Sequence, residues 1–223
     1  MTSALKIAIV GAESTGKSVL ADSLAQSLAE ATGLPAIAVP EWLRSWCERE
    51  GRTPRPDEQA AIAAEQQARI EAAAQTHAIV VCDTTALMTA VYSRMLFHDR
   101  SLEPMALAHQ RTMAITLLTA LDLPWVADGL QRDGPQVRTP VDDLVRELLI
   151  SHALPWALVA GSGPARLHSA LDAVAPLLRG RETPRQGLFS RLRERNAEPA
   201  ARAWSCEFCD DPGCEHALRR ATN

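Results

Sequence analysis

The sequence lacks any long apolar run. No stretch of its 223 residues approaches the roughly 18 consecutive apolar residues that a membrane-spanning helix requires. The first ten residues, MTSALKIAIV, are too short and too β-like for a secretory leader. These absences predict a cytoplasmic protein that has no membrane partner.

An excess of positive charge is also missing. The 23 Lys and Arg residues are outnumbered by 27 Asp and Glu residues, which gives a formal net charge of −4. A protein with this balance has no overall positive field to attract nucleic acid, so binding of a polyanion would need a local patch. Nucleic acid is therefore not an expected partner.

The hydrophobic content, 47% against 22% charged residues, is typical of a folded domain. Short apolar runs predict strands at residues 5–10, 36–39, 78–82, 114–118 and 156–160. Periodicity and propensity predict helices at residues 17–30, 41–50, 57–76, 84–97, 102–111, 141–151 and 165–178. This alternation predicts an α/β fold of parallel strands joined by helices, with ligands at the carboxyl ends of the strands.

The composition changes beyond residue 179. The segment RGRETPRQGLFSRLRERNAEPAAR is rich in arginine and poor in aliphatic side chains. We therefore expect one folded domain over residues 1–180, followed by an arginine-rich linker and a cysteine-rich tail over residues 181–223.

The most specific motif follows the first predicted strand. Residues 11–18, GAESTGKS, match the phosphate-loop pattern G-x-x-x-x-G-K-[ST] without a mismatch, between a predicted strand and a predicted helix. Backbone N–H groups of such a loop surround phosphates, its lysine reaches the β- and γ-phosphates, and its last hydroxyl ligates Mg²⁺. ATP and Mg²⁺ are the expected cofactors. The expected nucleotide-binding residues are Gly11, Glu13, Ser14, Thr15, Gly16, Lys17 and Ser18.

Two acids follow predicted strands and should lie at the same edge of the sheet as this loop. Asp83 ends the apolar run IVVCD, and Glu41 follows the second predicted strand. Asp83 is expected to bind Mg²⁺ with Ser18, and either acid could accept the proton of the hydroxyl that receives the phosphoryl group. Two structural interpretations stay open: Asp83 caps the next helix, or Glu41 is a first-turn acid favoured by the helix dipole.

The segment from 122 to 140 mixes Pro, Gly, Asp and Arg in irregular order. If the segment moves, Arg132 and Arg138 could close over the phosphates and stabilise the charge of the transferring group. The alternative is that these arginines are simply solvated. Trp42 and Trp125 are candidates to stack on a flat aromatic substrate, although the four-residue spacing of Trp42 and Trp46 is also typical of a packed helix face.

Taken together, these motifs resemble the NadR-type ribosylnicotinamide kinase domain, a branch of the P-loop kinases related to the small AAA-like ATPases. The resemblance covers about residues 5 to 178, in the segments GAESTGKS, PEWLR, CDTT, LPWVADGLQRDGPQVR and WALVAGSG. It implies a P-loop NTPase fold of three layers around a five-stranded parallel sheet. It also implies ATP-dependent phosphorylation of nicotinamide riboside to the mononucleotide, in NAD salvage.

The resemblance also implies roles for single residues. It puts Glu41 and Asp83 near the acceptor hydroxyl and Trp42 near the nicotinamide. Three further residues, Asp128, Arg132 and Arg138, would belong to the lid, with Asp128 touching the substrate. A second function class stays open, in which the domain is a regulatory P-loop ATPase or nucleotide sensor that acts on a protein partner through its tail.

Three of the five cysteines lie close together near the end of the chain. Cys206, Cys209, Cys214 and His216 offer four zinc ligands within eleven residues, with a turn at 211–213 between the pairs. A closed Zn²⁺ site of this kind would stabilise the tail or bind a partner, because it leaves no open position for catalysis. The other interpretation is a reduced, partly exposed cysteine cluster.

Metal analysis tests the zinc interpretation. Protein purified without chelator is expected to contain close to one equivalent of zinc, because four soft or borderline ligands lie together. A double variant, Cys206→Ser with Cys209→Ser, should lose the metal. Metal-free wild-type protein would refute the site.

Overall fold

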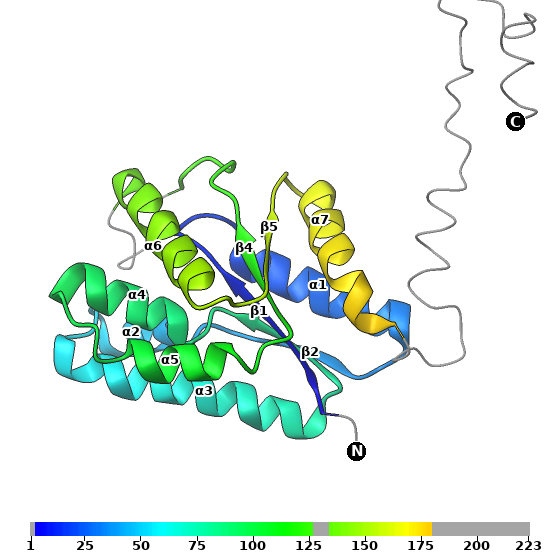
Figure 1. The fold of residues 1–223 in the computed structure, drawn as a ribbon, viewed down its shortest axis with the longest axis horizontal. Coiled ribbons are helices and arrows are strands. Elements are labelled where there is room, and N and C mark those ends of the chain that lie inside the picture. Colours follow the sequence, from blue (N-terminus) through cyan, green and yellow to red (C-terminus); the bar gives the residue numbers. More distant parts are fainter. Residues whose placement is uncertain (1–2, 127–133, 180–223) are drawn as a thin grey trace, which may run out of the picture.

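The computed structural model describes residues 3–126 and 134–179. Its centre is a sheet of five strands in the order β2-β3-β1-β4-β5, in which all four neighbouring pairs are parallel (Figure 1). The strands are β1 (Leu5–Val10), β2 (Ala36–Val39), β3 (Ile79–Asp83), β4 (Ile115–Thr119) and β5 (Trp156–Val159). The structure thus confirms the predicted α/β fold of the P-loop type.

Helices cover both faces of the sheet and complete three layers (Figure 1). On one face, α1 (Lys17–Thr32), α7 (Pro164–Val174) and the short helix η4 (Ala175–Leu178) share a core with the sheet. The opposite side carries α3 (Gln59–Thr76), α4 (Ala86–Phe97) and α6 (Arg138–Ser151). Two more helices, α2 (Trp42–Glu50) and α5 (Glu103–Gln110), pack against α3 and α4 respectively. No helix in the described ranges combines the length and hydropathy that a bilayer span requires.

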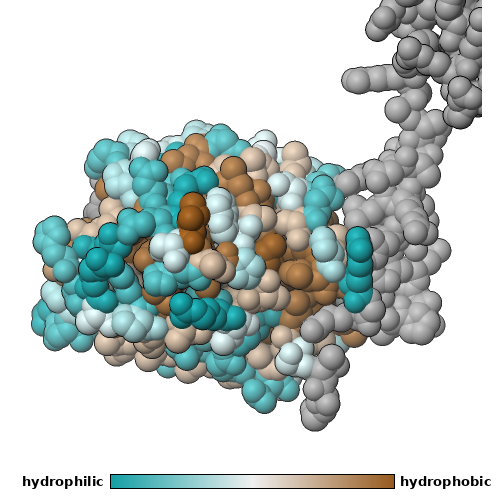
Figure 2. Space-filling view, viewed as in Figure 1, coloured by the Kyte–Doolittle hydropathy of each residue, from teal (hydrophilic) through white to brown (hydrophobic). Residues whose placement is uncertain are grey.

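Burial follows the position of each strand. The central strands β1 and β3 are covered on both faces, and their apolar side chains are almost fully buried. In contrast, β5 is an edge strand, and Leu158 on it is 45% exposed. In the view of Figure 2, hydrophobic side chains gather across the middle of the molecule, where Figure 1 shows β5 between α6 and α7. The ordered core therefore centres on β1, the strand that leads into the phosphate loop.

Most helix starts differ by one to three residues from the sequence-based prediction, and those of α6 and α4 bear on candidate site residues. Helix α6 begins at Arg138, three residues earlier than predicted, and includes Pro140 in its first turn. A proline is tolerated there because the first N–H groups of a helix have no partner within the helix. Helix α4 begins at Ala86, with Thr85 as its N-cap, whose hydroxyl accepts from the backbone N–H of Leu87. Asp83 is therefore not the helix cap.

Both cysteines of the described fold lie inside it. Cys47 is 2% exposed and Cys82 is completely buried. Burial raises the pKa of the Cys47 thiol to about 11 and that of Cys82 to about 12. The reactive thiolate is therefore scarce as well as inaccessible at neutral pH.

Alkylation of the folded protein by iodoacetamide is expected to spare both thiols. Peptide mapping should find Cys47 and Cys82 unmodified after a treatment that labels them completely in denaturant. Fast labelling of Cys82 in the native protein would contradict its burial.

Candidate active site

The phosphate loop joins the carboxyl end of β1 to the start of α1. Three of its residues have positive φ: Gly11 at 145°, Ser14 at 56° and Gly16 at 75°. A Cβ added to Gly11 would lie 2.2 Å from the Thr119 side-chain oxygen, so this position requires glycine. Gly16 is the N-cap of α1, and the positive end of the helix dipole therefore lies at the loop.

Lys17 lies at the centre of a charged cluster. Its Nζ donates to the carbonyl oxygen of Ala12 at 2.8 Å. Burial lowers the pKa of this ammonium group, and the negative charges of Glu41 and Asp83 oppose that change. Lys17 thus has two carboxylates close enough to influence its charge.

The sheet explains why the two acids are close together. β2 and β3 pair so that Val39 stands opposite Cys82, and Asp83 and Glu41 both lie just beyond this pair. Burial raises the pKa of both carboxyl groups, while the charge of Lys17 lowers each of them. The structure therefore brings Lys17, Glu41 and Asp83 together, as the sequence predicted.

A divalent cation fits the residues at this position. Hydrogen bonding from Ser18 lowers the pKa of Asp83, which relates the two expected Mg²⁺ ligands to each other. Among the described residues, the buried Oδ1 of Asp83 has no hydrogen-bond partner. No group of three His, Cys, Asp or Glu side chains in the described ranges could hold a metal by itself. One hydroxyl and one carboxylate suit Mg²⁺, which commonly takes its remaining ligands from phosphates and water.

Arg44 belongs to the same cluster, although sequence reasoning did not select it. Its Nε lies 4.0 Å from Glu41 Oε2, and its charge lowers the pKa of both Glu41 and Asp83. The signal in the sequence is the three-residue spacing in PEWLR, which puts an acid and an arginine on the same side of a helix. The cluster therefore contains two cations as well as two acids.

Thr84 is a second residue that the sequence did not mark. It is buried between Asp83 and the cap residue Thr85 and has a φ of 65°. A β-branched residue seldom adopts this conformation, which costs about 1–3 kcal/mol. Hydrogen bonding from its hydroxyl lowers the pKa of Glu41. Backbone strain thus occurs beside the two acids of the site.

The segment after β4 lies against the phosphate loop. Ser14 Oγ accepts from the backbone N–H of Val126 at 2.8 Å, and the carbonyl oxygen of Leu123 accepts from Arg138 Nη1 at 2.9 Å. Trp125 lies within this segment, and its buried Nε1 has no partner among the described residues. The segment therefore approaches the loop from the side of β4.

Arg138 is buried at the start of α6, although the sequence placed it in an irregular loop. Within the described part of the chain, its Nε and Nη2 have no hydrogen-bond partner. Two buried donors of this kind can bind an anion without displacing existing contacts. The other expected lid residues, Asp128 and Arg132, lie outside the described residues.

A second buried arginine was not foreseen. Arg166 on α7 forms an ion pair with Asp122, which follows β4, and its Nε donates to the carbonyl oxygen of Gly161 at 2.8 Å. These contacts join the segments that follow β4 and β5. They fix the backbone beside the phosphate loop at the carboxyl end of the sheet.

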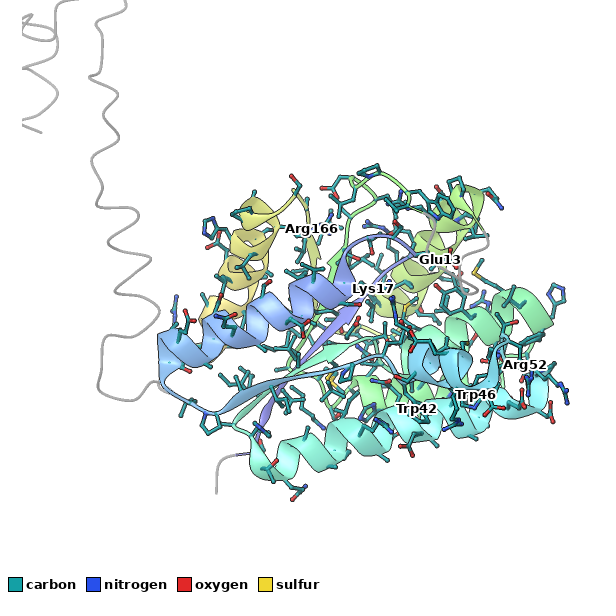
Figure 3. The ribbon with its side chains drawn as sticks, turned by 180° about the vertical axis from the view of Figure 1, so that it is seen from behind. Glu13, Lys17, Trp42, Trp46, Arg52 and Arg166 are labelled. Carbon is teal, nitrogen blue, oxygen red and sulfur yellow. The ribbon has the colours of Figure 1, made fainter. Side chains whose placement is uncertain are left out.

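Trp42 is covered by arginine side chains. The Arg69 guanidinium lies 3.9 Å from the centre of its ring, and that of Arg49 lies at 5.4 Å. Figure 3 shows Trp42 and Trp46 beside α3, below the region that holds Lys17 and Glu13. The structure therefore gives Trp42 cation–π partners within the fold.

The four expected zinc ligands, Cys206, Cys209, Cys214 and His216, lie outside the described residues.

Comparison with known families finds a match that runs from β1 into the first turn of α7. Residues 6–166, most of the chain, match the family model described as an AAA domain. The chain belongs to this AAA-domain family. Its P-loop implies nucleotide binding, and no curated protein matches the chain.

Solved structures similar to this AAA domain have kinase-like folds. A NadR protein in complex with NR has a TM-score of 0.61 at 21% identity, over 78% of this chain and 50% of that one. NadR in complex with NAD and AMP-PNP has a TM-score of 0.63 at 22% identity, over 78% and 49%. Deoxyadenosine kinase from M. mycoides, with dCMP and dCDP bound, has a TM-score of 0.53 at 12% identity, over 77% and 100%. The AAA domain thus spans about half the length of these NadR chains, and the likeness is one of fold.

Proposed function

We propose that this protein is an ATP-dependent small-molecule kinase that phosphorylates a nucleoside-like acceptor. The first candidate acceptor is the 5′-hydroxyl of nicotinamide riboside. The observation that carries the proposal is the cluster of Lys17, Glu41 and Asp83 at the start of α1. A second carboxylate besides the one suited to Mg²⁺ gives the site a group that can accept a proton from an alcohol.

The phosphate-loop motif and the position of the cluster support a role for each residue. Residues 11–18 bind the nucleotide phosphates, and Lys17 exchanges its contact with the Ala12 carbonyl for a phosphate oxygen. Ser18 and Asp83 would hold Mg²⁺, which neutralises charge on the phosphates when it is bound. Glu41 then orients the acceptor hydroxyl and takes its proton, although Asp83 is the alternative base.

Arg138 supplies positive charge to the proposed transfer site. Arg138 has two buried donors free of partners in the described ranges, and these suit the transferring phosphoryl group. Arg132 is proposed to act on the phosphates, Asp128 to contact the substrate and Trp125 to contact the flat part of the acceptor. The resemblance of its PE-x-x-R element also assigns Trp42 to this contact, although the Arg69 and Arg49 side chains already lie over its ring. The NadR structure with NR and the deoxyadenosine kinase support a nucleoside-like acceptor.

The proposed base predicts a pH dependence. Burial raises the pKa of Glu41, and a general base must be deprotonated to act. Turnover is therefore expected to be full at alkaline pH and to fall tenfold per pH unit below a pKa that lies above the ordinary value for glutamate. The measurement is kcat from pH 5 to 9. In Glu41→Gln the residual rate should lose this acidic limb; an unchanged limb would make Asp83 the base.

ADP release from Mg-ATP tests the function directly. Purified protein is assayed with nicotinamide riboside, with deoxyadenosine and with no acceptor, using Lys17→Ala as the blank. Strong stimulation by the riboside, with formation of the mononucleotide, is the expected result. Slow hydrolysis that ignores both acceptors would contradict a kinase of this type and favour a regulatory ATPase.

A further inference from the structure

Thr119 lies beneath the phosphate loop, although no motif marks it. It is the last residue of β4 and is fully buried. Its Oγ1 lies 2.7 Å from Thr15 Oγ1 and 3.2 Å from the carbonyl oxygen of Val10. Its single proton is donated to Thr15, because the proton of Thr15 goes to the carbonyl oxygen of Ala12. One side chain of the sheet therefore contacts both the middle of the loop and the strand that leads into it.

Thr15 extends these contacts to the lysine. Its buried hydroxyl lies 2.8 Å from the carbonyl oxygen of Ala12, the same oxygen that accepts from Lys17 Nζ. The polar chain from Thr119 through Thr15 to Ala12 thus ends at Lys17. A buried chain of this kind restricts the loop because each polar group would lose its partner if the backbone moved.

Gly11 gives independent evidence that the loop and Thr119 are in close contact. A Cβ at Gly11 would lie 2.2 Å from Thr119 Oγ1 and 3.2 Å from the carbonyl oxygen of Thr119. The loop therefore leaves β1 directly against the end of β4. Gly11 has a φ of 145°, which favours glycine, and the side chain of Thr119 leaves no space there for a Cβ.

We propose that Thr119 is a positioning residue for the phosphate loop, which holds Thr15 and the start of the loop in the conformation that binds nucleotide. The inference rests on the proposed function only in taking nucleotide as the ligand of this loop. Because these contacts hold the loop without help from the nucleotide, binding need not supply all of the free energy of ordering it. Loss of the Thr119 hydroxyl should then weaken nucleotide binding, although the proposed role of this hydroxyl involves no contact with the nucleotide.

Three variants test the role. Thr119→Ala removes the hydroxyl, and Thr119→Ser keeps it. Thr116→Ala is the matched control, because Thr116 is buried on the same strand and its hydroxyl accepts from Gln110 Nε2 at 2.8 Å. The control loses a buried hydrogen bond that does not involve the loop.

The first measurement is the dissociation constant of Mg-ADP by calorimetry. We expect Thr119→Ala to weaken binding about tenfold, and Thr119→Ser and Thr116→Ala to stay within about twofold of wild type. Unchanged binding in Thr119→Ala, or equal weakening in Thr116→Ala, would overturn the proposal.

The second measurement needs no nucleotide. Hydrogen exchange of the amides of residues 11–17 is expected to be about tenfold faster in Thr119→Ala, and unchanged in Thr119→Ser and Thr116→Ala. If the variants fold, equal protection of the loop amides in Thr119→Ala and wild type would overturn the proposal. Failure of the wild-type protein to phosphorylate any acceptor would instead refute the proposed kinase activity and leave the exchange result valid.

Discussion

Replacing Lys17 with alanine is expected to abolish phosphoryl transfer, with a loss of turnover of at least about 10³-fold. Without this ammonium group, Glu41 and Asp83 would repel the phosphates of ATP, and the loop would have no cationic side chain to offset the charge of the γ-phosphate. The measurement is single-turnover transfer from radiolabelled ATP. Circular dichroism should show an intact fold, since the loop backbone is held by contacts that do not involve Lys17.

The chain offers a matched control for this variant. Lys6 is the only other lysine, and it lies near the opposite end of β1. Its Nζ contacts Glu71 at 2.7 Å and Thr112 at 2.9 Å. Lys6→Ala is expected to lower the melting temperature and leave turnover per folded molecule unchanged. Full transfer activity in Lys17→Ala would refute the assignment of the phosphate loop.

Asp83→Asn is expected to lower turnover by about 10²- to 10³-fold while the dissociation constant for ATP changes less than about tenfold. Asparagine keeps the shape of the side chain and removes the negative charge that attracts Lys17 and would bind Mg²⁺. Because the carboxylate acts mainly when charge moves during transfer, its loss should affect kcat more than binding. Calorimetric titration with ATP and steady-state kinetics measure the two effects separately.

Asp99→Asn is the matched control for the loss of an acid. Asp99 lies between α4 and α5 and accepts from the backbone N–H and the hydroxyl of Ser101. This variant should keep wild-type turnover and lose a little stability. Equal kinetics in Asp83→Asn and wild type would reduce Asp83 to a structural residue.

The sequence predicted the elements whose signals are local. β1 and β2 match their predicted ranges because short β-branched runs end at glycine or proline. The cluster of Lys17, Glu41 and Asp83 was predictable because parallel strands deliver their following residues to the same edge of the sheet. Helix α6 was predicted too short because Pro140 looked like a break, although a proline fits a first turn.

Other features depend on contacts between distant segments. Nothing near Thr84 in the sequence signals a positive φ, which is imposed by the sheet before it and the capped helix after it. The cover over Trp42 comes from Arg69 on α3, 27 positions along the chain. Thr119 is separated from Thr15 by 104 positions and looks like an ordinary strand residue. Such pairings follow from tertiary packing, which no local pattern encodes.

The carbonyl oxygen of Ala12 keeps a hydrogen-bond donor when Lys17 turns towards a bound phosphate. It accepts from both Lys17 Nζ and Thr15 Oγ1, each at 2.8 Å, and a carbonyl has two lone pairs to do so. When Lys17 turns towards a phosphate, the hydroxyl of Thr15 remains as donor, so no buried acceptor is left unpaired at a cost of about 1–3 kcal/mol. The turn of Lys17 towards a phosphate therefore adds no unpaired buried acceptor to the cost of nucleotide binding.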